Sequence, residues 1–142
     1  MAGNVQGLIA SYTNPILFTL DKLSIAPVFA ISNRKLRGGY TGAAFIAYNG
    51  TNSAVADVAF YNNIEVTDSS TVTITSAGSS GYSVGQTMSY STFKGSATIS
   101  VIHYDQSTTA NHPTQTSGGS RPRIANAGTN DIMNNSKLGI RF

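Results

Sequence analysis

The chain has no cysteine and no tryptophan, and only 11% of its 142 residues are charged. The absence of cysteine excludes disulfides, thiolate metal ligands and thiol catalysis. A chain of this length buries a core large enough to fold as one domain without cross-links. It has no apolar run long enough to cross a membrane, and no basic N-terminal region followed by an apolar stretch. We therefore expect neither membrane insertion nor a signal peptide.

The formal net charge is only +3, and the basic residues do not form one dense run. Three of them cluster at residues 34–37, and four more are spread through the C-terminal part, at Arg121, Arg123, Lys137 and Arg141. Nucleic-acid-binding surfaces are typically denser in basic residues and carry exposed aromatic residues among them. We therefore expect no nucleic-acid partner. A surface with so few charges favours packing against other protein subunits.

Alternation of apolar and polar residues predicts four β-strands. The alternating stretches are rich in β-branched and aromatic residues and bounded by turn formers, and they cover residues 43–48, 54–60, 71–75 and 97–104. The segment 67–90 is rich in Ser, Thr and Gly and predicts a hairpin around the third stretch. The pattern indicates an all-β fold, with a single domain over residues 26–142.

One segment departs from this pattern and predicts a short α-helix near residues 27–36. Pro27 suits a first helical turn, the apolar residues that follow can share one face, and Gly38-Gly39 supplies a stop. The basic cluster at residues 34–37 would then lie in the last turn, where the helix dipole favours positive charge. This placement accounts for the cluster without a ligand.

The stretch HYDQSTTANHPTQT, residues 103–116, contains both histidines of the chain and one of its six carboxylates. Its residue types allow a metal site, a Ser-His-Asp site or a turn that ends a strand. A metal site needs three or four ligands with supporting groups, whereas this loop offers two imidazoles and one carboxylate. A Ser-His-Asp site needs the histidine between the other two groups and an oxyanion hole, and no strained nucleophile turn is present.

We therefore predict that His103, Asp105 and Ser107 form a structural corner, with no catalytic residue, no metal and no cofactor. Asp105 is expected to accept hydrogen bonds from backbone N–H groups of residues 107–111, because short polar side chains commonly do so at turns. Alternation along the preceding strand places His103 on its apolar face. There it is expected to fill space beneath the sheet, so that phenylalanine or tryptophan can replace it.

Two motifs that lie far apart in the chain share a pattern with known sequences. The stretch NRKLRGGYTGAAFIAY, followed by ADVAF, is similar to a segment of the form SLRKLRxxYTGxxIRVRRSSDN…DIGF. The stretch ISVIHYDQSTTANHPTQTSGGSRPRIANAG is similar to TTWYDQSGNGNNATQTTxxxQPRIVNAG. In this order and spacing they resemble phage virion proteins, especially tail-fibre and other appendage proteins, that are similar to the catalytic domain of α-L-arabinofuranosidase B. The resemblance covers about residues 24–142 and implies a β-sandwich of the concanavalin or jelly-roll type.

The sequence departs from this family at several positions. The arginine-rich strand is replaced by FIAYNGTN, the family's tryptophan is His103, and its glycine is Thr108. Relatives continue with FDGxDD into the second half of the sandwich, where the arabinofuranosidase carboxylates lie, whereas this sequence ends in SKLGIRF. No catalytic residue is therefore carried over. We expect the sandwich to be completed either by the chain's own strands or by a neighbouring subunit.

These observations predict a non-enzymatic structural protein of the bacteriophage virion, on the particle surface. It would be a capsid decoration or head-fibre subunit, or a short tail-fibre module. Its expected partners are other capsid or tail proteins, further copies of itself in a homo-oligomer, and host-surface glycans. The alternative is a carbohydrate-binding module or a degenerate glycosidase of the arabinofuranosidase type. Sugar contacts would then come from Tyr104, Asp105, Gln106 and Asn111.

Residues 1–25 precede most of the resemblance and include the apolar stretch NPILFTLDKL. We predict that this segment anchors the chain to the particle. The same apolar residues are equally suited to a place in the core, and composition leaves both alternatives open.

Overall fold

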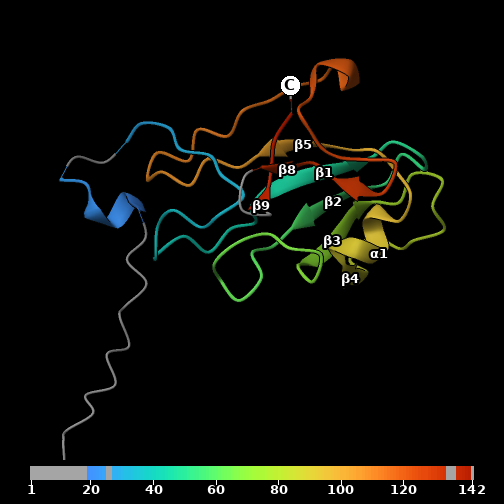
Figure 1. Cartoon of the computed structure of the whole chain (residues 1–142), viewed down its shortest axis with the longest axis horizontal. Helices are drawn as coiled ribbons and strands as arrows, with labels where there is room; N and C mark the ends of the chain where they lie inside the picture. Colours follow the sequence, from blue (N-terminus) through green and yellow to red (C-terminus); the bar gives the residue numbers. More distant parts are fainter. Residues whose placement is uncertain (1–18, 25–26, 134–136, 142) are drawn as a thin grey trace, which may run out of the picture.

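A computed structural model of the chain describes residues 19–24, 27–133 and 137–141 (Figure 1). Within these residues, seven antiparallel strands form one sheet in the order β4-β3-β2-β1-β5-β6-β7, and two short strands form a second sheet. The strands are β1 (Phe45–Asn49), β2 (Val55–Val58), β3 (Thr71–Ser76), β4 (Thr87–Ser89), β5 (Ile99–His103), β6 (Arg123–Asn126), β7 (Thr129–Asn130), β8 (Ile132–Met133) and β9 (Lys137–Leu138). The helical elements are α1 (Tyr90–Lys94) and two short 3-10 turns, η1 (Thr19–Lys22) and η2 (Gly118–Ser120).

One face of the large sheet forms the core, which we call the inner face. Side chains along a strand alternate between the two faces, so Phe45 and Ala47 of β1 are buried while Ile46 and Tyr48, which alternate with them, remain partly exposed. The central strands share this alternation. Their buried inner residues are Phe45, Ala47, Ala56, Val58, Val72, Ile74, Ile99 and Val101.

Two parts of the chain cover the inner face. The helix α1 begins after Ser89, whose hydroxyl accepts a hydrogen bond from the N–H of Thr92 at 3.2 Å and so caps the helix. The helix buries Phe93 and Tyr90, and the ring of Tyr90 meets Phe45 edge-on at 6.5 Å. From the C-terminal part, Leu138 and Ile140 pack against the same cluster. The result is a sandwich-like arrangement in which one sheet is covered by a helix and a short hairpin.

The predicted all-β, sandwich-like fold with one short helix is confirmed. Strands β1, β2, β3 and β5 lie within the four stretches predicted from alternation, to within a residue or two. The hairpin expected over residues 67–90 is formed by β3 and β4, with Thr71 opposite Ser89. The alternation is a dependable signal here because each of these strands buries one face and exposes the other.

The position predicted for the helix is wrong. Residues 27–36 are not helical, and the α-helix of the described chain is α1. A helix pairs each backbone N–H with the carbonyl four residues earlier, but the N–H groups of this segment pair with distant residues. Ala30 donates to the Asp105 carboxylate at 2.8 Å, and Leu36 donates to the Gln106 side chain at 2.7 Å. These long-range bonds hold residues 27–36 as an irregular segment, which we call the strap.

The basic cluster at residues 34–37 was predicted to stabilise the end of this helix. That role is wrong as well, because no helix ends there. Lys35 is buried, and its Nζ donates to Oδ1 of Asn63 at 2.6 Å. Arg37 donates from Nε to the backbone oxygen of Gln106 at 3.1 Å. Two of the three basic side chains therefore tie the strap and its continuation to neighbouring loops.

The segment predicted to anchor the chain, residues 1–25, lies for the most part outside the described residues. Its described end, η1, is held against the chain that follows the strap. Leu20 donates its backbone N–H to Leu36 at 2.8 Å, and the Asp21 carboxylate accepts the N–H of Gly38 at 2.8 Å.

Candidate functional site

The carboxylate of Asp105 is the centre of the motif that the sequence singled out. It is 0% exposed and accepts hydrogen bonds from the backbone N–H groups of Ala30, Ser107 and Asn111 at 2.8 to 2.9 Å. The hydroxyl of Ser107 adds a fourth bond at 2.6 Å. The bonds from Ser107 and Asn111 are those expected from the sequence, whereas the bond from Ala30 spans 75 residues and was not foreseen.

The neighbouring Gln106 is the second clamp on the strap. Its side chain is also 0% exposed. Its Oε1 accepts the N–H of Leu36 at 2.7 Å, and its Nε2 donates to the backbone oxygens of Arg34 at 2.9 Å and Ser32 at 3.2 Å. Its own backbone N–H donates to the oxygen of Ala30 at 2.7 Å. One side chain thus pairs with three backbone groups of the strap, beside the antiparallel bridge that Arg34 forms with Glu65.

The electrostatics of Asp105 suit a permanent acceptor. Burial alone would raise the pKa of this carboxyl group, but the hydrogen bonds from Ser107, Ala30 and Asn111 stabilise the charged form and hold the pKa at about 2. At neutral pH the group carries no proton to donate, and its oxygens are already occupied by donors of the chain. It is therefore unsuited to act as a general acid or as a nucleophile in this arrangement.

His103 belongs to a separate buried network. Its Nε2 lies 2.6 Å from Oδ1 of Asn33, and Nδ2 of Asn33 donates to the backbone oxygen of Leu138 at 3.0 Å. Because the asparagine uses its NH2 group toward Leu138, its oxygen faces the histidine, so Nε2 of His103 carries the proton. Burial lowers the pKa of His103 to about 4, which keeps the ring neutral.

This network changes the expectation that phenylalanine can replace His103. The ring does fill space beside Phe45, at 5.2 Å between ring centroids. Phenylalanine would fill the same space but would leave the oxygen of the buried Asn33 without its donor, which costs about 1 to 3 kcal/mol. A replacement must therefore supply a hydrogen-bond donor as well as volume.

The parts of a metal or Ser-His-Asp site are present in the sequence but are not brought together. Ser107 bonds directly to Asp105, with no imidazole between them. His112 instead accepts the backbone N–H of Asp105 through Nδ1 at 3.1 Å, and His103 bonds to Asn33. Among the described residues, no three His, Asp or Glu side chains are grouped closely enough to hold a metal ion. No helix among the residues that the structure describes is long and apolar enough to cross a membrane.

The four residues proposed for sugar contact differ in their access to solvent. Asp105 and Gln106 are fully buried and bonded within the chain. Tyr104 is partly exposed, donates its hydroxyl to Asp57 at 2.8 Å and packs edge-on against the ring of His112 at 4.9 Å. Asn111 is exposed. A ligand on this surface therefore meets Tyr104, His112 and Asn111, and the two buried side chains act only by holding the loop.

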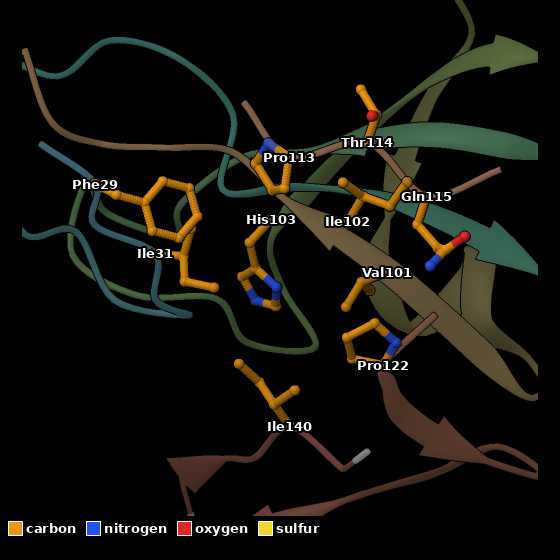
Figure 2. Close-up of a pocket in the computed structure, with 10 residues that line it drawn as sticks. All are labelled: Phe29, Ile31, Val101, Ile102, His103, Pro113, Thr114, Gln115, Pro122 and Ile140. Atoms are coloured by element: carbon orange, nitrogen blue, oxygen red, sulfur yellow. The ribbon is translucent and has the colours of Figure 1, made fainter. Parts of the chain in front are cut away.

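A second feature, absent from the sequence analysis, is an apolar groove beside the strap. Its cavity of about 200 Å³ is lined by side chains from the strap, β5, the loop after it and the C-terminal part, chiefly Phe29, Ile31, His103, Pro113, Pro122 and Ile140 (Figure 2). We call it the Phe29 groove. The apolar side chains between positions 27 and 36 were the sequence signal for this groove, but the predicted helix placed them on its buried face.

Comparison with known proteins gives no match. No family model, no curated protein and no solved structure is significantly similar to this chain. The resemblance to phage virion proteins therefore rests on the two motifs quoted above.

Replacing Asp105 by alanine should destabilise the protein by about 3 kcal/mol or more, because several buried donors lose a charged acceptor at once. The change in the free energy of unfolding is measured by urea unfolding, followed by circular dichroism. Asp21→Ala is the matched control, since its carboxylate is exposed and accepts a single backbone N–H, and it should cost less than about 1 kcal/mol. Equal losses of unfolding free energy in the two variants would contradict the conclusion that Asp105 holds the strap in place.

His103 should make stability depend on pH. Its pKa is about 4 in the folded protein and 6.5 in the unfolded chain, so between these values the unfolded chain binds a proton that the folded protein does not. The free energy of unfolding should therefore fall by about 1 to 2 kcal/mol between pH 7 and pH 5. His103→Gln, which can still donate to Asn33, should lose this dependence, and His112→Gln should keep it. An unchanged pH dependence in His103→Gln would show that the buried histidine is not its source.

Proposed function

We propose that the chain is a non-enzymatic structural protein of a bacteriophage particle surface, either a capsid decoration or head-fibre subunit or a short tail-fibre module. The observation that carries the proposal is the full use of the Asp105 carboxylate within the fold. The motif with the residue types of a catalytic site is committed to holding the strap against the end of β5, and its carboxylate has no oxygen left for a substrate.

The outer face of the large sheet supports a packing role. Cross-strand rows place Ile46 beside Ile102 and Tyr48 beside Val55, and three of these four side chains remain partly exposed. The row of Ile46 continues through Asp57 of β2 to Thr73 of β3. Asp57 accepts the hydroxyl of Tyr104 at 2.8 Å, and the guanidinium of Arg121 stacks over the ring of Tyr48 at 3.6 Å, so both charged groups already have partners within the chain. A partly apolar face whose charged groups are already paired within the chain is suited to contact with a neighbouring subunit, because few free charges have to be desolvated.

The edges of the sheet are less suited to strand addition. The terminal strands β4 and β7 contain three and two residues. Edges this short offer few unpaired backbone groups to another chain. Assembly with other virion proteins or with further copies of the chain is therefore proposed to use the outer face rather than the edges.

The proposal is tested on purified phage particles that carry the protein. Labelled antibody and electron microscopy should find it on the particle surface in ordered positions, and quantitative mass spectrometry should give a fixed copy number for each particle. The purified chain should not hydrolyse arabinofuranosides. Absence from the particle would contradict the proposal. Saccharide binding or hydrolysis by the isolated chain that is lost in Tyr104→Ala would favour the carbohydrate-binding alternative instead.

A further inference from the structure

Lys94, the last residue of α1, belongs to a polar cluster that is separate from the Asp105 corner. Its side chain is only 8% exposed, although lysine is one of the residues least often buried. Its Nζ donates to Oδ1 of Asp68 at 3.0 Å and to Oδ1 of Asn130 at 2.9 Å. Nδ2 of Asn130 donates in turn to the same Asp68 oxygen at 2.9 Å. An amine, a primary amide and a carboxylate thus contact one another, and we call these three residues the Lys94 triad.

The Lys94 triad joins three parts of the fold that are distant in the sequence. Lys94 ends α1, Asp68 lies in the loop before β3, and Asn130 ends β7, the last strand of the large sheet. Lys94 and Asn130 are 36 positions apart. Figure 1 shows α1 and the strap at opposite ends of the sheet. The triad is therefore remote from the motif that the sequence singled out.

The triad contains the chemical groups that an exchange of amides requires. A neutral lysine amine is a nucleophile, and the side-chain carbonyl carbon of asparagine is an electrophile from which ammonia can leave. A base must take a proton from the amine, and an acid must give a proton to the leaving nitrogen. One oxygen of Asp68 contacts both nitrogens, so this carboxylate is placed to carry the proton from the first to the second.

The amine and the carbonyl group of the triad are already in contact. Nζ of Lys94 lies 2.9 Å from the carbonyl oxygen of Asn130, and the carbon to be attacked is bonded to that oxygen. Attack from above the amide plane requires only rotation within the lysine side chain, which has a flexible four-carbon stem. Groups held together in this way react with effective concentrations of about 10⁵ to 10⁸ M. Folding thus favours a reaction that is slow between free side chains in water.

The surroundings of the triad suit this reaction. Burial raises the pKa of Asp68, but the hydrogen bonds from Asn130 and Lys94 and the charge of Lys94 outweigh burial and lower it, so the group is a carboxylate at neutral pH. Nζ of Lys94 lies over the ring of the buried Tyr90, 5.6 Å from its centroid. On the other side Asp68 is half-exposed, and a cavity of about 230 Å³ is lined by Asp68 and Asn130. The ring covers the amine, and released ammonia can leave through the cavity.

We propose that Lys94 and Asn130 form an intramolecular isopeptide bond, with Asp68 carrying the proton between them. Nζ attacks Cγ of Asn130 while Asp68 takes a proton from Nζ. The Cγ–Nδ2 bond then breaks while Asp68 gives this proton to Nδ2, and the products are a secondary amide and ammonia. The amine reacts in its neutral form, after one proton has passed to solvent, and the released ammonia takes up an equivalent proton.

The bond gives a chain without cysteine a covalent cross-link. It closes a loop that contains β5, the Asp105 corner and β6, and it ties the edge strand β7 to α1. A cross-link of this kind stabilises a fold mainly by restricting the unfolded chain, as a disulfide does. The reaction occurs once in each chain and concerns bonding within that chain, so the inference does not rest on the proposed function.

The mass of the purified full-length protein tests the proposal directly. A linked chain is lighter than its sequence by the mass of one ammonia. Trypsin cannot cleave after a linked Lys94, and Arg121 is protected by the proline that follows it. Residues 38–123 should therefore stay joined to residues 124–137 in one branched peptide. A full-length mass without this deficit, or cleavage after Lys94 in most chains, would overturn the proposal.

Substitutions identify the source of the deficit. Lys94→Gln and Asn130→Ala should each restore the full mass, because one reacting group is missing. Lys35→Gln is the matched control, since Lys35 also donates to an asparagine side chain, at 2.6 Å, and here the deficit should persist. A deficit that survives Lys94→Gln or disappears in Lys35→Gln would contradict the assignment. A succinimide at Asn49-Gly50 also loses ammonia, but it would leave Lys94 open to trypsin and so would contradict the proposal too.

The role of Asp68 has its own test, which does not depend on removing a reacting group. Asp68→Ala keeps the amine and the amide but removes the proton carrier. The linked fraction of freshly purified protein should fall about tenfold or more, because a positioned acid–base group accelerates such steps at least that much. The branched tryptic peptide measures this fraction. A linked fraction equal to that of the wild type would show that Asp68 does not carry the proton.

Discussion

The hydrogen bonds that join the strap to the side chains of Asp105 and Gln106 are the interaction on which the rest of the structure depends. The strap forms one antiparallel bridge, between Arg34 and Glu65, where Lys35 donates its N–H to Ile64 at 2.6 Å. Outside this bridge, the two buried side chains accept the N–H groups of Ala30 and Leu36. A buried N–H without a partner would cost about 1 to 3 kcal/mol. The corner after β5 is thus both the end of a strand and the attachment point for a segment about seventy residues earlier in the sequence.

This attachment determines where the surface features lie. Once the strap is fixed, Phe29 and Ile31 form one wall of the groove, and Asn33 reaches His103 on β5 and the backbone of Leu138. The inner face of the sheet, the strap and the C-terminal hairpin are therefore joined by polar bonds as well as by apolar packing. The same hydrogen bonds leave the Asp105 carboxylate, which serves four donors of its own chain, without a free oxygen for a substrate.

The sequence predicted the features that depend on neighbouring residues. Strands β1, β2, β3 and β5 follow from alternation, and the bonds of Asp105 to Ser107 and Asn111 follow from the habit of Asp at turns. The strap could not be predicted, since its apolar spacing fits a helix and its true partners lie 70 and 75 residues away. The actual helix α1 has five residues, too few for a periodic signal. Gln106 was assigned to sugar contact because nothing local indicates that it is buried.

Native-state hydrogen exchange at Ala30 and Leu36 tests the central claim most directly. Both amides donate to buried side chains of the corner, so they should exchange as slowly as amides of the core strand β1, although residues 27–36 form neither a helix nor a strand. Exchange at the rate of an exposed turn such as that at Gly81 would contradict the account, because the strap would then not be held by Asp105 and Gln106.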